Sequence, residues 1–465
     1  MSYQVQANET SSATQSSSLV QDIKLGEKIG YGFGDLASNL VWSSMSMFIV
    51  FFYTDVIGIG ASIIGTIMLF SRFFDGITDL VMGAVIDKTK SKHGKARPWI
   101  LWTAVPFAIT TALLYAVPDI GEVGQIVYIV LTYNLLTLLY TAINIPYGVL
   151  NSLITQDQYQ RSLLNVFRTI FAMIGVIIVS TVTMPLVNLL GGGQSGWVYT
   201  FVIYGALGAL LFLITFNKTK ERVKPAVTSG PNSKVPLKKG LKALLKNKYW
   251  FVALVFFLTT YLGTALFQGS TIYFAQYILG SPELVGLLTV ASIVPTLVGL
   301  LMVAPLIKKF GKRNSMVGGL ILTVVGSLII VLDPNSLLMV VIGSIMRGIG
   351  TAPVLGSKFA MLADTIEYGE WKSGIRTEGL VYSAGSMGSK VGTGLGVALI
   401  GWTLAWGGYM GGEAVQTDSA LFSIYVLFIY LPILISVIQI MLLGLYKLDK
   451  QYPQIVKELH ERANE

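Results

Sequence analysis

The segment Arg72-Phe73-Phe74-Asp75-Gly76-Ile77-Thr78-Asp79 places two carboxylates and an arginine inside a long apolar stretch, residues 61–86. A charge near the centre of a bilayer costs at least about 2.5–3.5 kcal/mol, so charges there usually serve a function. Asp75 and Asp79 are four residues apart and face the same way on a helix, with Arg72 and Thr78 beside them. Two like charges so close repel each other, which favours a bound proton or cation. The segment predicts a cation or proton site within a membrane helix.

The composition indicates an integral membrane protein. Only 12% of the 465 residues are charged, against about 25% in a soluble domain. The chain has no Cys, and its two histidines, His93 and His460, stand in polar stretches. A thiol nucleophile, a disulfide framework and a histidine-based triad or zinc site inside the membrane are therefore excluded. We expect a protein that is not an enzyme.

About twelve membrane spans are predicted, at roughly 20 apolar residues each, which makes the chain an all-α integral membrane protein. The spans cover residues 28–55, 62–87, 98–118, 124–152, 163–189, 198–217, 249–279, 284–308, 314–332, 336–363, 379–408 and 419–446. The predicted organisation is a disordered tail at 1–27, six-helix halves at 28–217 and 249–446, a basic linker at 218–248 and a second tail at 447–465.

The net charge of +9 comes from Lys and Arg in alternate loops, such as residues 88–97 and 308–313, whereas the opposite loops contain neither residue. This asymmetry is typical of cytoplasmic loops. We expect a multi-pass protein of the cell membrane with both termini in the cytoplasm, a lipid bilayer around it and no nucleic-acid partner. The end of the linker, residues 237–248, is either a surface helix or part of a plain tether.

The two halves share features in the same order. A basic loop follows both the second and the eighth span, and Asp157 follows Pro146 at the same spacing as Asp364 follows Pro353. Two six-helix repeats of the same orientation predict the major facilitator architecture, with a central site between the halves.

Several motifs together resemble one family, the glycoside–pentoside–hexuronide:cation symporters of the melibiose-permease group. They are Gly30-Tyr31-Gly32-Phe33-Gly34-Asp35, Phe52-Tyr53-Thr54-Asp55, Asp75 with Asp79, Gly94-Lys95-Ala96-Arg97-Pro98-Trp99, Asn144-Ile145-Pro146-Tyr147-Gly148 and Glu367-Tyr368-Gly369-Glu370-Trp371-Lys372. The resemblance covers nearly the whole chain after the tail. The fourth-span motif is most similar to that of the xyloside and glucuronide carriers.

This resemblance implies that Asp75 and Asp79 bind the coupling cation, with Thr78 as a neighbouring ligand. The melibiose carriers have Asn at the position of Thr78, a departure that weakens the case for Na⁺. Paired acids can also carry a proton, because their proximity favours protonation of one of them. We therefore expect H⁺ as the coupling ion, with Na⁺ at the same two acids as the alternative and no other cofactor.

The resemblance also implies a sugar site. Asp35 matches the acidic residue that the family has in the first span, and Arg168 matches the arginine that it has in the fifth. In the fourth span, where the family has a second acidic residue, this chain has Asn144. Gly148 occupies the position of the aromatic residue that stacks on the sugar. The residues that we expect to replace this aromatic are Trp42, Tyr140, Thr141 and Tyr147.

Lys390 matches a family lysine that faces the second-span acids. We assign it, with Arg72 and Glu378, to the coupling of charge to transport. Arg347 and Lys358, both in the tenth span, have no assigned role.

These expectations describe a symporter that imports a glycoside, namely a xyloside, pentoside or related di- or oligosaccharide, by alternating access. Two alternatives stay open. The first is an uncoupled facilitator or exchanger, and the second is a lipid-handling or sensing protein of the same fold. A homo-oligomer is also compatible with the sequence.

Overall fold

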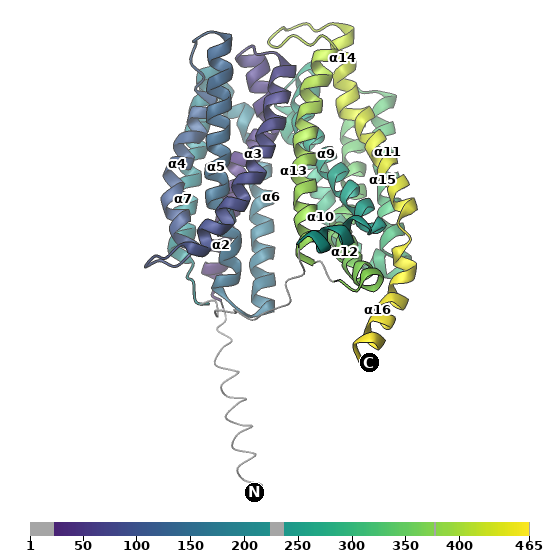
Figure 1. Ribbon diagram of the computed structural model, residues 1–465. Coiled ribbons are helices and arrows are strands. Elements are labelled where there is room, and N and C mark those ends of the chain that lie inside the picture. Colours follow the sequence, from purple (N-terminus) through teal and green to yellow (C-terminus); the bar gives the residue numbers. More distant parts are fainter. Residues whose placement is uncertain (1–22, 224–236, 376–377, 465) are drawn as a thin grey trace.

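The computed structural model describes residues 23–223, 237–375 and 378–464, and the described residues form helices and no strand. Figure 1 shows long helices standing side by side, with the start of α2 and the helix α16 at the same end of the molecule. The helices are α2 (Leu25–Phe51), the π-helix η1 (Phe52–Val56), α3 (Ala61–Lys88), α4 (Arg97–Tyr115), α5 (Glu122–Ile154), α6 (Gln158–Leu189), α7 (Gly193–Lys218), α8 (Leu237–Leu245), α9 (Lys248–Tyr277), α10 (Leu284–Phe310), α11 (Lys312–Leu332), α12 (Leu337–Ser373), α13 (Glu378–Trp406), α14 (Asp418–Tyr425), the π-helix η2 (Val426–Tyr430), α15 (Leu431–Leu445) and α16 (Leu448–Asn464).

Within the described ranges, eleven helices are long and apolar enough to cross a membrane. A twelfth long helix, α13, packs between them against α3 and α9. It is rich in glycine and serine and contains Lys390. The predicted all-α membrane fold is confirmed.

Two predicted boundaries differ from the structure. The tenth span was expected to end at 363, but α12 continues to Ser373. Its polar continuation is held by the ion pair between Asp364 and Lys312 and by the edge contact of Tyr368 with Tyr249. The chain after residue 446, which we expected to be a tail, forms the amphipathic helix α16. Both segments lie beyond an apolar run, so a hydropathy criterion does not find them.

Helices α2–α7, here called the N-terminal half, meet α9–α15, the C-terminal half, through α3 with α13, α6 with α10 and α2 with α9. The distal end is the end of the helices opposite the start of α2 and the helix α16, at the top of Figure 1. There the halves touch through backbone. A Cβ on Gly401 would lie 2.2 Å from the carbonyl oxygen of Ala61, and one on Gly286 would lie 2.8 Å from the Cα of Thr181.

Side chains also bridge the halves at the distal end. One carboxylate oxygen of Asp55, in η1, accepts hydrogen bonds of 2.5 Å from the hydroxyls of both Tyr277 and Tyr409. Beside it, the hydroxyls of Thr54 and Tyr273 lie 2.9 Å apart. The structure is therefore closed at the distal end.

Candidate substrate and cation site

The acid pair of α3 is bound to a lysine from the other half of the molecule. The Nζ of Lys390, on α13, lies 3.2 Å from a carboxylate oxygen of Asp75 and forms a second ion pair with Asp79. It also donates a 3.1 Å hydrogen bond to the backbone carbonyl of Asp75. Arg72 lies 3.8 Å from Asp75 on the same helix. The negative charges of Asp75 and Asp79 are therefore balanced by the positive charges of Lys390 and Arg72, at a point between the two halves.

Two threonines lie near the acid pair, and only one of them has its hydroxyl beside the carboxylates. Thr141 Oγ1, on α5, lies 3.2 Å from one oxygen of Asp75 and 3.0 Å from one oxygen of Asp79. Thr78, in contrast, donates a 3.0 Å hydrogen bond to the carbonyl of Asp75 within its own helix. The threonine that the structure places between the two carboxylates is Thr141, whereas Thr78 as a cation ligand stays a prediction.

A cavity of about 380 Å³ opens beside the acid pair, within the range of small-molecule sites. Its aromatic wall consists of Trp42 and Tyr140, whose rings stack with centroids 4.3 Å apart. The Arg72 guanidinium lies 4.4 Å from the centroid of the Trp42 ring. We call this space the central cavity. Its lining residues are Asn39, Trp42, Ser43, Ser46, Arg72, Asp75, Asp79, Tyr140, Thr141, Asn144, Ile145, Val176, Tyr261, Thr264, Ala265, Gln268, Ser389, Lys390 and Thr393.

Among the predicted sugar ligands, Asn144 lines the central cavity and donates a hydrogen bond to the Ser38 hydroxyl at 3.3 Å. Asp35 is placed differently: it accepts a 2.5 Å hydrogen bond from Arg168, and neither residue lines the central cavity. Asn39, one helical turn further along α2, lines it instead. The roles of Asp35 and Arg168 as sugar ligands stay predictions.

Tyr147 lies beside this ion pair rather than in the cavity. Its hydroxyl donates to the carbonyl of Tyr31, the Tyr31 hydroxyl donates to the carbonyl of Tyr147, and the two rings stack. Arg168 covers the Tyr147 ring at 5.0 Å. These contacts fix α2 against α5. Glu378 begins α13, and its side chain lies outside the described part of the chain.

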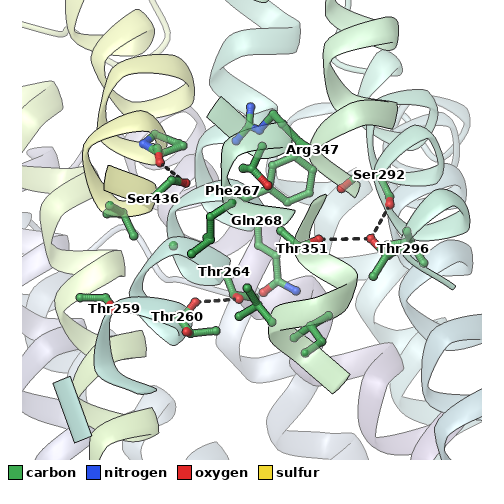
Figure 2. Close-up of a pocket in the computed structure, with 18 of the residues that line it drawn as sticks. Thr259, Thr260, Thr264, Phe267, Gln268, Ser292, Thr296, Arg347, Thr351 and Ser436 are labelled. Atoms are coloured by element: carbon green, nitrogen blue, oxygen red, sulfur yellow. Dashed lines mark hydrogen bonds between the residues drawn. The ribbon is translucent and has the colours of Figure 1, made fainter. Parts of the chain in front are cut away.

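A second cavity, of about 320 Å³, is lined mostly by the C-terminal half and shares Val176, Thr264 and Gln268 with the central cavity. We call it the C-terminal cavity. Figure 2 shows hydroxyl and amide side chains around it, together with Arg347. The sequence analysis missed this cavity. The available signal was a polar stripe in an otherwise apolar span, formed by Thr259, Thr260, Thr264 and Gln268 on α9.

The comparisons with known proteins agree with this architecture. Residues 30–450 match the family model for MFS/sugar transport proteins. The isoprimeverose transporter of Lactiplantibacillus pentosus is 34% identical, with 99% of this chain and 97% of the relative covered. The inner membrane symporter YicJ of Escherichia coli (strain K12) is 32% identical over 88% of this chain and 89% of its own length. A glucuronide carrier protein homolog of the same organism is 30% identical over 93% and 95%, respectively.

Among solved structures, the nucleoside transporter NupG is similar with a TM-score of 0.60 at 14% identity, covering 90% of this chain and 98% of its own. At that identity the likeness concerns the fold alone. The family match spans most of the sequence, and the relatives are transporters rather than enzymes. This chain therefore belongs to the MFS/sugar transport protein family.

Proposed function

We propose that this protein imports a glycoside, of the xyloside or pentoside class or a related di- or oligosaccharide, together with a cation. One observation carries the proposal. An acid pair from one half and a lysine from the other meet at a sugar-sized cavity between the halves. The names of the relatives, an isoprimeverose transporter and a symporter, support it.

The geometry of Lys390 favours H⁺ over Na⁺ as the coupling ion. The ammonium already contacts both carboxylates, so a sodium ion must displace it before it can bind between them. A proton can join one carboxyl oxygen without displacing the lysine. Protonation of Asp79 removes one of the two ion pairs that connect α3 to α13, so the proton weakens a link between the halves. Such an effect is reciprocal: if the proton favours sugar binding, the sugar tightens proton binding by the same factor.

We further propose that the end carrying both termini is cytoplasmic, in a cell membrane. The basic loops, and the position of the start of α2 and of α16 at the same end of the molecule in Figure 1, support this orientation. The distal closure then seals the central cavity from the outside. Alternating access requires that this closure opens and that the halves approach each other at the other end.

The test is uptake into proteoliposomes of labelled methyl xyloside, galactoside and glucuronide, with H⁺ and Na⁺ gradients imposed separately. Accumulation driven by the H⁺ gradient alone is the expected result. Asp79→Asn should abolish accumulation and retain exchange of substrate between the two sides. The matched control is Asp119→Asn, an exposed acid at the distal end, which should accumulate substrate as the wild type does.

Two results would contradict this proposal. Uphill accumulation by Asp79→Asn would show that this acid does not couple transport to the ion. Glycosides that only equilibrate under both gradients would instead identify an uncoupled facilitator.

A further inference from the structure

Four lysines line one cavity of about 430 Å³ between α8 and the end of α12. Lys239 and Lys242 belong to α8, and Lys246 directly follows it. These three are spaced three and four residues apart, so they face the same way on a helix. Lys372 joins them from the last turn of α12. We call this space the lysine cavity. It lies opposite the distal end, because α9 begins beside it and reaches the distal end at Tyr277.

The lysine cavity has no counter-charge of its own. All four lysines are exposed, and no acidic residue is among the described residues that line the cavity. None of the four ammonium groups forms an ion pair within the described ranges. Like charges that share one cavity repel each other, so a bound anion would stabilise this arrangement.

Another basic cavity at the same end of the molecule differs in this respect. It measures about 470 Å³, and its lining includes Arg313, Lys447 and Lys450 together with Asp449. The Asp449 carboxylate also accepts a 2.8 Å hydrogen bond from the backbone N–H of Arg313. Membrane topology alone explains lysines in the loops at this end. It does not explain why four of them surround one cavity without an acid.

Hydrogen bonds fix the walls of the lysine cavity. Asn247, which lines it, caps α9 by accepting a 3.0 Å hydrogen bond from the backbone N–H of Trp250. The Asn247 amide donates a 2.7 Å hydrogen bond to the carbonyl of Thr365 on α12. The segment after α8 is thereby held against α12, and the start of α9 is held beside the lysines. The start of a helix carries a partial positive charge, which adds to the attraction for an anion.

The apolar residues of α8 point to a lipid as the source of this anion. Leu244 is 3% exposed and packs in one cluster with Tyr249 and Trp250, which fixes α8 to the C-terminal half. Leu245 is 67% exposed, and it follows Lys242 by three residues, so the two lie side by side on the helix surface. An exposed apolar side chain among lysines is typical of a helix at a membrane surface. A free phosphate ion would make no use of Leu245.

We propose that the lysine cavity binds the phosphate of an anionic phospholipid, with Leu245 beside the acyl chains. The proposed orientation places the cavity at the cytoplasmic surface of the bilayer, where anionic lipids attract lysines. This site depends on that orientation but on neither the glycoside nor the coupling ion. The bound lipid connects α8, the last part of the linker between the halves, to the end of α12.

The experiment measures binding of short-chain phosphatidylglycerol to the purified full-length protein in a nonionic detergent. Binding is followed by the rise in melting temperature with lipid concentration. Phosphatidylcholine of the same chain length is the zwitterionic probe. Sodium phosphate, compared with sodium chloride at equal ionic strength, tests a free anion. We expect phosphatidylglycerol to bind at least roughly tenfold more tightly than phosphatidylcholine, and sodium phosphate to give no more stabilisation than sodium chloride.

Variants test the lysines themselves. One lysine near an anionic lipid strengthens binding roughly five- to sixfold, so the double variant Lys242→Gln/Lys246→Gln should bind phosphatidylglycerol roughly 30-fold more weakly. Lys372→Gln, on the opposite wall, is an independent variant and should weaken binding by the single-lysine factor. The matched control is Lys308→Gln/Lys309→Gln, which removes two exposed lysines at the end of α10. Neither lines the lysine cavity, so this control should bind as the wild type does.

Three results would overturn the inference. Equal binding of the two lipids by the wild type would exclude a site for anionic lipid. Stabilisation by sodium phosphate that Lys242→Gln/Lys246→Gln abolishes would assign the cavity to a soluble anion instead. Equal weakening in the Lys308→Gln/Lys309→Gln control would show that the lipid responds to the total charge of this end rather than to the cavity. None of these results bears on the uptake of glycosides, which the proteoliposome assay tests separately.

Discussion

Replacing Asp55 by Asn should open the distal end of the carrier. The Asp55 carboxylate is the acceptor at the centre of the contacts between the halves, and its donors Tyr277 and Tyr409 both belong to the C-terminal half. Burial above all, and then the neighbouring Tyr273 and Asp55, raise the pKa of Tyr409. Its hydroxyl therefore stays protonated and able to donate. Asn keeps an oxygen acceptor at this position but removes the negative charge.

The size of the effect follows from these two hydrogen bonds. A hydrogen bond to a charged group contributes about 1.5–3 kcal/mol, and a neutral one about 0.5–1.5 kcal/mol. Losing about 1 kcal/mol in each of the two bonds destabilises the closed end by about 2 kcal/mol. That corresponds to roughly a 30-fold change in the ratio of closed to open carriers.

The assay uses the absence of cysteine from the chain. Ser46→Cys, in the lining of the central cavity, would be the sole thiol in the protein. With the distal end facing outwards, as proposed above, a membrane-impermeant maleimide added outside intact cells can reach this thiol only through an open distal end. We expect Asp55→Asn to accelerate labelling by up to roughly 30-fold, and Asp119→Asn, an exposed acid at the same end, to leave the rate unchanged. An unchanged or slower rate in Asp55→Asn would refute the view that Asp55 holds the halves together.

Three further predictions concern other contacts. The Glu221 carboxylate accepts three backbone hydrogen bonds of 2.9 Å at the start of α4, so Glu221→Ala should destabilise the protein by about 2 kcal/mol; an unchanged melting temperature in detergent would contradict this. Lys390→Gln removes the ammonium that connects the acid pair of α3 to α13, so accumulation in proteoliposomes should be lost; wild-type accumulation would exclude a coupling role. Gly401→Val places side-chain atoms where even a Cβ would lie 2.2 Å from a carbonyl oxygen of the opposite half; external labelling should rise and uptake fall, and unaltered values of both would count against the distal closure.

The sequence predicted the membrane helices well, because an apolar run of sufficient length has few alternatives to a transmembrane helix. The sequence did not predict the helical segments that continue beyond an apolar run, at the end of α12 and in α16. The polar end of α12 is stabilised by Lys312, far away in the sequence, and hydropathy carries no information about such partners.

The candidate site was predictable in part. Spacing alone placed Asp75 and Asp79 on one face of a helix, and the family resemblance brought Lys390 to them from the other half. Spacing does not fix how one helix is rotated against its neighbours. For this reason Thr141 rather than Thr78 lies between the acids, and the pairing of Asp35 with Arg168 appears only in the fold.

The balanced charges around Lys390 bear on how the membrane potential drives transport. In the proposed cycle, Lys390 and Arg72 balance the two acids when no ion is bound, so these four groups contribute little to any effect of voltage on the return of the empty carrier, and the electrical work falls on the loaded step. A neutral glycoside carried with one proton adds one positive charge, worth about 2.3 kcal/mol per 100 mV. A glycoside that carries a carboxylate would cancel that charge, and its uptake would then follow the proton and substrate concentrations alone. The same carrier would thus be electrogenic for one class of sugar and electrically silent for another.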